Sequence, residues 1–258
     1  MSRSDKPETR SVRPGSDMLG VLGGMGPMAT AAFYRELIVS TSGRTDQDHI
    51  PVVIWADPSV PDRTAALTGA GPDPTPWLIR GATALESAGA TVLAIACNTA
   101  HAFLPAIEAA VAVPVLNMID ETCERVAGTL PSGSRVGVLA TTGTHRSKLY
   151  QHGLADRQLA YLAPTDTIQA AVTKAISSIK AGESQDVAHE LLMCAGQLFT
   201  SAGADILVAG CTELALVSDG LTFGVPMIDS TSTLAEATVR YLREKKVPRD
   251  ASAAGQNA

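Results

Sequence analysis

The 258-residue sequence lacks several features that mark broad classes of protein. It has no excess of basic residues: 20 Lys and Arg stand against 26 Asp and Glu, giving a formal net charge of −6. Proteins that bind nucleic acid phosphates carry clustered Lys and Arg, so we expect no nucleic-acid partner. The longest apolar runs, such as residues 90–96, are far shorter than the roughly 20 residues that a membrane-spanning helix needs. We therefore expect no membrane association.

Patterns for disulfides, metals and secretion are missing as well. The four cysteines form no C-x-x-C pair, and none of the five histidines has zinc spacing to a cysteine or acidic residue. We expect no metal. Residues 1–16 include basic side chains but neither an apolar core nor a small-residue cleavage site, so they are not typical of a signal peptide. These observations favour free thiols and a cytoplasmic location.

What the sequence does contain is an alternation of short apolar runs and Ala-rich amphipathic stretches. It lies between polar segments at 1–16 and 249–258, which we predict to be disordered tails. Strands are predicted at 18–23, 50–57 and 90–96, and helices at 27–43, 74–89 and 99–111. Continuous apolar strands bounded by Gly and Pro indicate a parallel sheet flanked by helices on both faces.

The chain also repeats itself once. Three short patterns from its first half recur in the same order in its second half: 20–22 at 137–139, 88–93 at 202–207, and 113–114 at 225–226. We therefore predict an α/β fold of two lobes related by a pseudo-twofold, each a parallel sheet flanked by helices, with the site in the cleft between them. Lobe 1 is predicted to comprise 17–117 plus 225–245, with the last helix packed on it, and lobe 2 to comprise 118–224. The alternative is chance similarity, because β-α units share their composition.

Two of the cysteines occupy equivalent places in this repeat. Asn98 and Thr99 follow Cys97, and Thr212 follows Cys211, and these are residue types that favour helix starts. Each sulfur is thus predicted to lie at the carboxyl end of a strand and beside a helix N-terminus, which lowers a thiol pKa below its usual value of about 8.5. If the lobes face each other, the two sulfurs lie on opposite walls of one cleft.

The other cysteines and the histidines are less informative. Cys123 and Cys194 lie inside amphipathic helical stretches, where packing as small apolar residues is the simpler interpretation. His101 follows Cys97 by four residues and could tune its thiolate, but it could equally cap or pack.

A glycine-rich turn follows the first predicted strand. Its Gly24, Met25 and Gly26 belong to a formal match to the dinucleotide fingerprint, but no acidic residue follows at the expected place near the end of the next strand. We therefore favour a smaller anion, such as a carboxylate, bound by the backbone N–H groups of the turn over NAD. The repeat-equivalent turn offers amides and hydroxyls for the same purpose at Thr141, Gly143 and Thr144.

Two cations are candidates for binding a carboxylate. Arg63 lies in a Pro-rich loop, 57–64, at the end of the second predicted strand, where its guanidinium could make two parallel hydrogen bonds. A solvated Arg paired with Asp62 is the alternative. Lys180 closes a predicted helix, and a Lys there is also a common C-terminal helix signal.

Taken in order, these motifs resemble those of the aspartate/glutamate racemase family, nearest its aspartate racemase branch, from about Met18 to Tyr241. They are Gly23-Gly24-Met25-Gly26-Pro27, Pro61-Asp62-Arg63-Thr64, Cys97-Asn98-Thr99-Ala100-His101 and Gly210-Cys211-Thr212-Glu213-Leu214. The resemblance implies a two-lobed, cofactor-independent homodimer with Cys97 and Cys211 as catalytic pair and Arg63 and Lys180 as carboxylate ligands. Glutamate racemases usually carry His at the position of Glu213, and this departure favours aspartate over glutamate as substrate.

The implied reaction agrees with the residues. Racemisation needs a base on one face of the α-carbon and an acid on the other, and a thiolate and a thiol can supply both. Stabilisation of the developing charge is then expected from amides and hydroxyls at Asn98, Thr99, Thr141, Thr144 and Thr212. We thus predict a racemase for L- and D-aspartate or a close acidic analogue.

Two other functions remain open at this point. One is a decarboxylase or cis-trans isomerase of the same superfamily acting on a dicarboxylate, and decarboxylation of this kind needs one proton-donating cysteine rather than two. The other is a non-catalytic amino-acid-binding module, which would need the cationic clamp but not the thiols.

Overall fold

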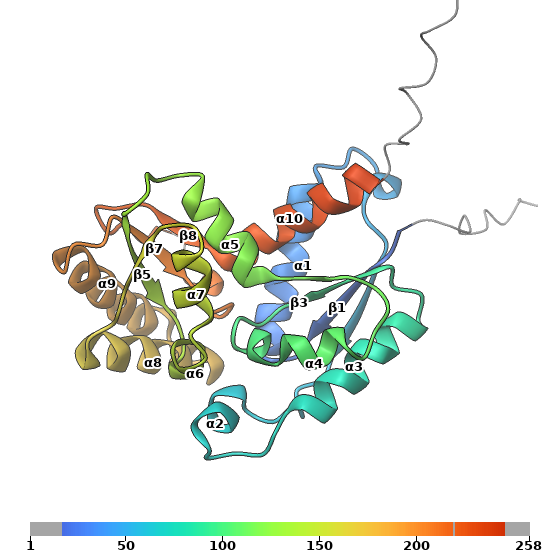
Figure 1. Cartoon of the computed structure of the whole chain (residues 1–258), viewed down its shortest axis with the longest axis horizontal. Coiled ribbons are helices and arrows are strands. Elements are labelled where there is room, and N and C mark those ends of the chain that lie inside the picture. Colours follow the sequence, from blue (N-terminus) through green and yellow to red (C-terminus); the bar gives the residue numbers. More distant parts are fainter. Residues whose placement is uncertain (1–16, 219, 246–258) are drawn as a thin grey trace, which may run out of the picture.

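The structure is a computed structural model of the chain, and it describes residues 17–218 and 220–245. The predicted tails at 1–16 and 249–258 lie outside the described residues. The described part forms two lobes, each built on a parallel four-stranded sheet (Figure 1). The two sheets have the same strand order, β2-β1-β3-β4 in the first and β6-β5-β7-β8 in the second, which confirms the predicted α/β architecture.

The first lobe follows the predicted alternation of strands and helices closely. Its elements are β1 (Leu19–Gly23), α1 (Pro27–Thr41), η1 (Asp46–Asp48), β2 (Val52–Ala56), α2 (Arg63–Thr68), α3 (Thr75–Ser87), β3 (Val92–Ile95), η2 (Thr99–Phe103), α4 (Leu104–Glu108) and β4 (Val115–Leu116). Strand β3 is fully buried because successive side chains point to opposite faces and both faces are covered. Val92 and Ala94 pack with α1, whereas Leu93 and Ile95 pack with α3 and α4.

The second lobe repeats this plan. Its elements are α5 (Met118–Ala127), β5 (Arg135–Leu139), α6 (Thr142–Arg146), α7 (Leu149–Ala155), β6 (Ala160–Leu162), α8 (Asp166–Lys180), α9 (Gln185–Ser201), β7 (Ile206–Ala209), η3 (Leu214–Leu216), β8 (Met227–Asp229) and α10 (Ser230–Lys245). Strand β7 is buried like β3, with α8 and α9 on one face and α5 and α7 on the other.

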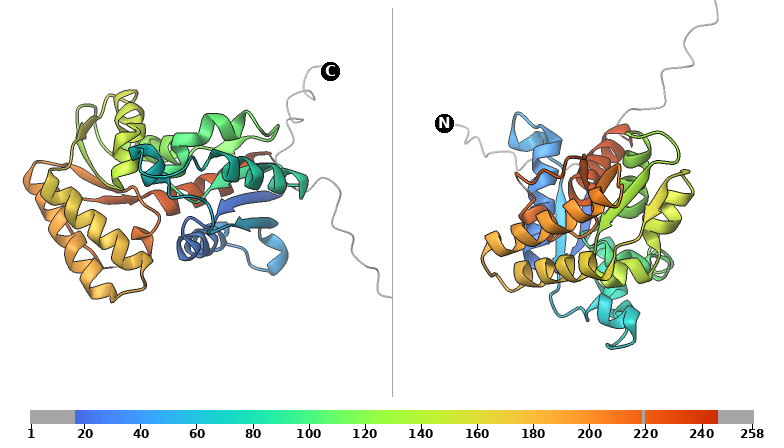
Figure 2. Two further views of the ribbon diagram at one scale, coloured as in Figure 1. Left: turned by 90° about the horizontal axis from the view of Figure 1, so that it is seen from below. Right: turned by 90° about the vertical axis from the view of Figure 1, so that its left-hand side faces the viewer.

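The predicted assignment of 225–245 to lobe 1 is wrong in part. Strand β8 pairs with β7 and completes the second sheet, because it is the repeat equivalent of β4 in the first. Helix α10 then leaves the second sheet, and its residues pack against α1 of the first lobe and against α5. Its span across the junction of the lobes is visible in Figures 1 and 2. The remaining lobe boundaries stay a prediction.

The predicted helix over 99–111 is interrupted. Residues 99–103 form the 3-10 turn η2, and the short helix α4 starts at Leu104. Pro105 has no N–H to donate to the carbonyl of His101, so a continuous α-helix cannot pass this point, whereas a proline is tolerated in the first turn of α4.

Candidate active site

Cys97 and Cys211 line the same pocket, one from each lobe. Cys97 follows β3 and Cys211 follows β7, so both lie beyond the carboxyl ends of central strands. The two residues are similarly buried, at 5% and 6% exposed. The pocket, which we name the inner pocket, has a volume of about 20 Å³, room for about one water molecule.

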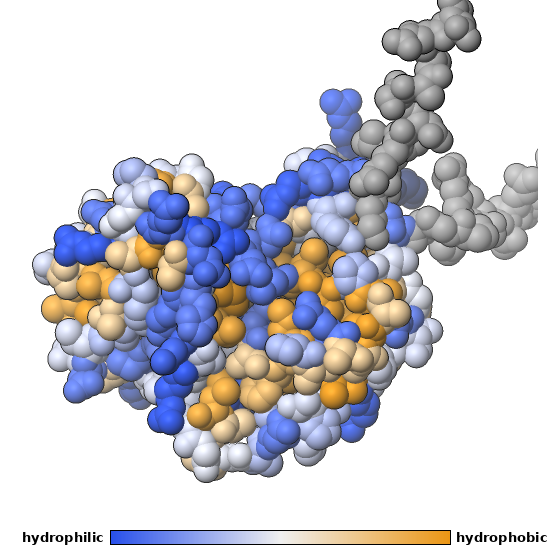
Figure 3. Space-filling model, in the orientation of Figure 1, coloured by the Kyte–Doolittle hydropathy of each residue, from blue (hydrophilic) through white to orange (hydrophobic). Residues whose placement is uncertain are grey.

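Most of the residues proposed from sequence meet in the inner pocket. Those that line it are Met25, Arg63, Cys97, Asn98, Thr99, Thr141, Lys180, Cys211, Thr212 and Glu213. Asp62 and Thr64 line it too and were not among the proposed site residues, although both belong to the Pro-Asp-Arg-Thr motif that the sequence analysis singled out. Figure 3 shows one face of the molecule, on which hydrophilic side chains form a band that runs down its middle.

A larger outer pocket of about 340 Å³ adjoins the inner one. Gly24 and Gly26 line only this outer pocket. Five residues line both pockets and form what we call the neck between them: Met25, Asp62, Arg63, Lys180 and Glu213. Apolar residues make up much of the remaining outer wall, including Met28, Val60, Ile179 and Leu216.

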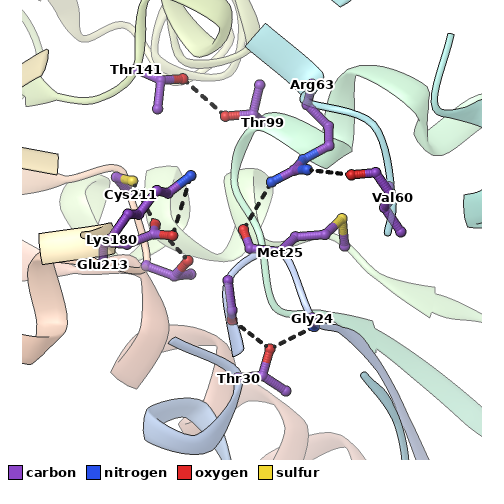
Figure 4. A network of polar contacts seen from close by, with 12 residues as sticks. Gly24, Met25, Thr30, Val60, Arg63, Thr99, Thr141, Lys180, Cys211 and Glu213 are labelled. Carbon is purple, nitrogen blue, oxygen red and sulfur yellow. Dashed lines mark hydrogen bonds and ion pairs between the residues drawn. The ribbon is translucent and has the colours of Figure 1, made fainter. Parts of the chain in front are cut away.

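Arg63 is buried at the neck and not a solvated partner of Asp62. Its Nη1 donates to the carbonyls of Val60 and Pro61 at 3.2 and 3.1 Å, and its Nη2 donates to the Met25 carbonyl at 3.0 Å (Figure 4). The Asp62 carboxylate instead accepts from the Ala65 N–H and caps α2. The Arg63 Nε is buried without a hydrogen-bond partner, so this donor is not used by the protein itself.

Lys180, Glu213 and Cys211 form a contiguous polar group on the opposite side of the site (Figure 4). Lys180 Nζ lies 3.5 Å from Glu213 Oε1, and the Cys211 thiol donates to Glu213 Oε2 at 3.0 Å. Burial lowers the pKa of Lys180, but electrostatic interactions, with Glu213 first among them, outweigh burial, and the net shift is upward.

The predicted lowering of the Cys211 pKa is wrong. Burial first, and then the charge and hydrogen bond of Glu213, raise the pKa of this thiol well above its usual value. The elements that directly follow the two cysteines along the chain, η2 and η3, are short 3-10 turns and not helices. The helix-dipole argument therefore does not decide the pKa of Cys211, which burial and, after it, the neighbouring carboxylate raise.

Three threonine hydroxyls meet where the lobes touch. Thr99 Oγ1 lies 2.9 Å from the hydroxyls of both Thr141 and Thr144, which are 3.1 Å from each other. Thr144 is fully buried and does not line the pocket, whereas the other two do. Gly143 also lies outside the pocket lining, and a Cβ there would come within 2.7 Å of the Thr64 hydroxyl. The glycine thus permits close contact between α6 and α2.

Asn98 is fixed by two residues that the sequence analysis missed. Its Oδ1 accepts from the Tyr150 hydroxyl at 2.6 Å, and its Nδ2 donates to Ser230 Oγ at 2.9 Å. Ser230 in turn donates to the carbonyl of Ala209 at 2.8 Å. The only sequence signal for Ser230 was its place directly after the recurring Val-Pro segment and Asp229; nothing local pointed to Tyr150.

One backbone N–H group of the glycine-rich turn is already hydrogen-bonded within the protein. The N–H of Gly24 donates to Thr30 Oγ1 at 2.9 Å, so the predicted anion site on the turn does not have this amide free. Gly24 has φ of 89°, and a Cβ there would overlap the backbone of Asp57, so only glycine suits the position.

His101, Cys123 and Cys194 do not line the inner pocket. His101 Nε2 accepts from the Met118 N–H, so Nδ1 carries the proton that is donated to the Cys97 carbonyl at 2.9 Å. Its ring therefore packs and does not bond the Cys97 sulfur. Cys123 is buried in α5 as expected, but Cys194 is exposed on α9, so the packing interpretation was wrong for Cys194.

Within the ranges that the structure describes, no three His, Cys, Asp or Glu side chains are grouped in a way that could hold a metal ion. No helix in those ranges combines the length and apolar character that a bilayer span requires.

Comparison with known proteins gives consistent matches over nearly the whole chain. Residues 22–238 match the family described as Asp/Glu/Hydantoin racemase. The broad specificity amino-acid racemase RacX of Bacillus subtilis is 31% identical over 228 residues, which cover 86% of this chain and 96% of that protein.

Solved structures show the same fold. The aspartate racemase of Picrophilus torridus superposes with a TM-score of 0.78 at 30% identity, covering 88% of this chain and 94% of that one. A glutamate racemase of Bacillus anthracis superposes with a TM-score of 0.66 at 21% identity, covering 91% of this chain and 84% of its own.

Proposed function

Because the chain belongs to the Asp/Glu/Hydantoin racemase family, we propose that it interconverts L- and D-aspartate, or a close acidic analogue, by a two-base mechanism without pyridoxal phosphate. The observation that carries the proposal is that Cys97 and Cys211, from equivalent places in two similar lobes, line one pocket. One thiolate and one thiol can then act on the two faces of a single α-carbon.

The proton balance of the proposed reaction involves only the two sulfurs and the α-carbon. The thiolate of one cysteine removes the α-proton and becomes a thiol, while the electron pair remains on the substrate as a carbanion. The thiol of the other cysteine then donates its proton to the opposite face and becomes a thiolate. The product has inverted configuration, and the cysteine roles are exchanged for the reverse direction.

Cationic groups at the neck support an acidic substrate. The free Nε–H of Arg63 and the ammonium of Lys180 are the donors we assign to the substrate carboxylates. Hydroxyl and amide groups of Asn98, Thr99 and Thr212 line the inner pocket, and we assign them to stabilise the charge that moves onto the α-carboxylate. The inner pocket has room for about one water molecule, so an amino acid cannot enter it in this conformation. Either the side chains at the neck have to move, or the two lobes have to separate.

A broader range of amino acids is the second candidate. The outer pocket of about 340 Å³ adjoins the neck and has an extensive apolar wall, which suits a substrate side chain larger or less polar than that of aspartate. The similarity to a broad specificity amino-acid racemase supports the same possibility.

The test is a racemisation screen in deuterated water. L- and D-aspartate, glutamate and a panel of neutral amino acids are incubated separately with the enzyme, with α-deuterium followed by NMR and enantiomers by chiral chromatography. Activity on aspartate supports the first proposal, and activity on several neutral amino acids favours the second candidate. Ligand binding without α-proton exchange by a folded protein would contradict both and favour a binding module.

We also propose that the enzyme is a cytoplasmic homodimer, in line with the family resemblance. The four cysteines are free, which suits a reducing compartment. Apolar side chains exposed on α1, at Met28, Ile38 and Val39, provide a surface for association. Light scattering at several protein concentrations tests the dimer, and a constant monomer mass would contradict it.

A further inference from the structure

The two cysteines of the site differ in one respect that the pseudo-symmetry does not predict. Cys211 donates its thiol proton to a carboxylate, Glu213 Oε2, at 3.0 Å. Among residues 17–218 and 220–245, no carboxylate is hydrogen-bonded to the sulfur of Cys97. Asn98 and Thr99 occupy the repeat positions of Thr212 and Glu213, so the residue two places after Cys97 is a threonine and not a carboxylate.

Glu213 is held in place from several directions. Its side chain is 5% exposed, and the ammonium of Lys180 lies 3.5 Å from Oε1 and balances its charge. The Thr212 hydroxyl donates to Oε2 at 3.4 Å, the same oxygen that receives the Cys211 proton. A Cβ at Gly26 would lie 3.3 Å from Oε1, so the glycine turn leaves room for the carboxylate.

We propose that Glu213 is a positioning residue that keeps the proton on Cys211, so that the enzyme without substrate carries its thiol there and forms its thiolate on Cys97. A carboxylate beside a sulfur repels a negative charge on that sulfur, and its hydrogen bond is lost when the thiol ionises. The raised pKa of Cys211 agrees with this arrangement. The inference rests on the proposed function only in giving Cys97 the role of base and Cys211 that of acid at the start of turnover.

Measurements of kcat/KM cannot show which of the two cysteines holds the thiolate. The equilibrium constant of racemisation is one, so kcat/KM must be equal in the two directions at every pH. The preferred thiolate position can therefore appear only in kcat and KM taken separately for each enantiomer, or in the reactivity of the free enzyme. The reactivity of the free enzyme requires no turnover and reports the thiolate position directly.

The experiment measures alkylation of each cysteine by iodoacetamide between pH 6 and 9, with labelled peptides quantified by mass spectrometry. Cys97 and Cys211 are almost equally buried, so a difference in their rates reports ionisation more than access. Exposed Cys194 provides an internal reference. In the wild-type protein we expect Cys97 to react about tenfold or more faster than Cys211, since one pKa unit changes the thiolate fraction about tenfold.

Replacement of the carboxylate tests the cause. In Glu213→Gln the rate at Cys211 should rise and its pH profile should move to lower pH, whereas Glu213→Asp should remain nearer to wild type because it keeps the charge. Glu190→Gln, which removes an exposed carboxylate on α9, is the matched control and should change nothing.

The proposal is overturned if wild-type Cys211 reacts as fast as Cys97, a result that needs no variant to fold. It is also overturned if folded Glu213→Gln, checked by circular dichroism, leaves the Cys211 profile unchanged. Labelling that is asymmetric in a protein without racemase activity would refute the proposed function and leave this inference standing.

Discussion

The side chains of Asn98 and Ser230, 132 positions apart in the chain, are joined by a buried hydrogen bond of 2.9 Å. Asn98 follows the strand that ends at the inner pocket, and Ser230 begins the helix that packs across both lobes. The same bond therefore orients a pocket side chain and connects it to the junction of the lobes. Tyr150 completes the arrangement by donating to the other side of the Asn98 amide at 2.6 Å.

Tyr150→Phe should destabilise the protein. The substitution keeps the ring but leaves the buried Asn98 Oδ1 without its donor, which costs about 1–3 kcal/mol. Thermal and urea denaturation should show the loss. Tyr34→Phe is the matched control, since Tyr34 is 39% exposed on α1 and should lose little. Equal stability of Tyr150→Phe and wild type would mean that this bond makes no net contribution.

Cys97→Ala and Cys211→Ala should each abolish most racemisation, because each removes the acid or base on one face of the α-carbon. Losses of about 10²- to 10⁴-fold in kcat are expected for one proton-transfer group. Cys194→Ala, which removes an exposed thiol on α9, should keep full activity. The measurement is the initial rate of appearance of the D-enantiomer from the L-enantiomer. If either pocket variant retained more than a tenth of the wild-type rate, the two-base mechanism would be untenable.

The sequence allowed the architecture and the pair of cysteines to be predicted because both depend on local signals. Apolar runs at β1, β3, β5 and β7 are bounded by Gly and polar residues, and their recurrence predicted two similar sheets. Strand β8 was assigned to the wrong lobe because two apolar residues beside a proline do not show which sheet they join.

The electrostatics of the site could not be predicted in the same way. Glu213 belongs to a motif that the sequence analysis singled out, but its effect on Cys211 depends on a 3.0 Å contact that only the folded backbone creates. Tyr150 comes from α7, and no spacing relates it to Asn98. Arg63 was expected in the cleft, yet the three carbonyls that hold it come from two loops brought together by folding.

Gly143→Ala should disturb the contact between α6 and α2. The added Cβ would lie 2.7 Å from the Thr64 hydroxyl, 2.9 Å from its Cα and 3.0 Å from Thr99 Cγ2, so backbone has to move. Such overpacking costs about 1–3 kcal/mol, and displacement of Thr99 should also lower kcat. Gly128→Ala is the control, because its nearest contacts are ordinary at 3.6 Å and its φ of −72° suits alanine. Unchanged stability and kcat in Gly143→Ala would show that the lobes adjust freely there.

Stability should decrease as pH falls below neutrality, partly through His145. Burial lowers the pKa of this imidazole to about 4, from 6.5 in the unfolded chain. Between these values the unfolded state binds a proton that the folded state does not, so folding free energy is lost as pH falls from about 6.5 to 4. The loss attributable to His145 is up to about 3 kcal/mol, since one pKa unit corresponds to about 1.4 kcal/mol. Buried His101, whose pKa is also lowered, acts in the same direction.

The contribution of His145 can be isolated by substitution. Its Nδ1 is 2.7 Å from the Tyr161 hydroxyl, and its buried Nε2 has no hydrogen-bond partner, so the N–H that a charged imidazolium carries at Nε2 would be unsatisfied. In urea unfolding at pH 7 and pH 5, His145→Gln should reduce the difference in stability, whereas exposed His152→Gln should leave it as in wild type. If His145→Gln lost as much stability as wild type over this interval, the pH dependence would have to arise from other groups, with His101 the first to examine.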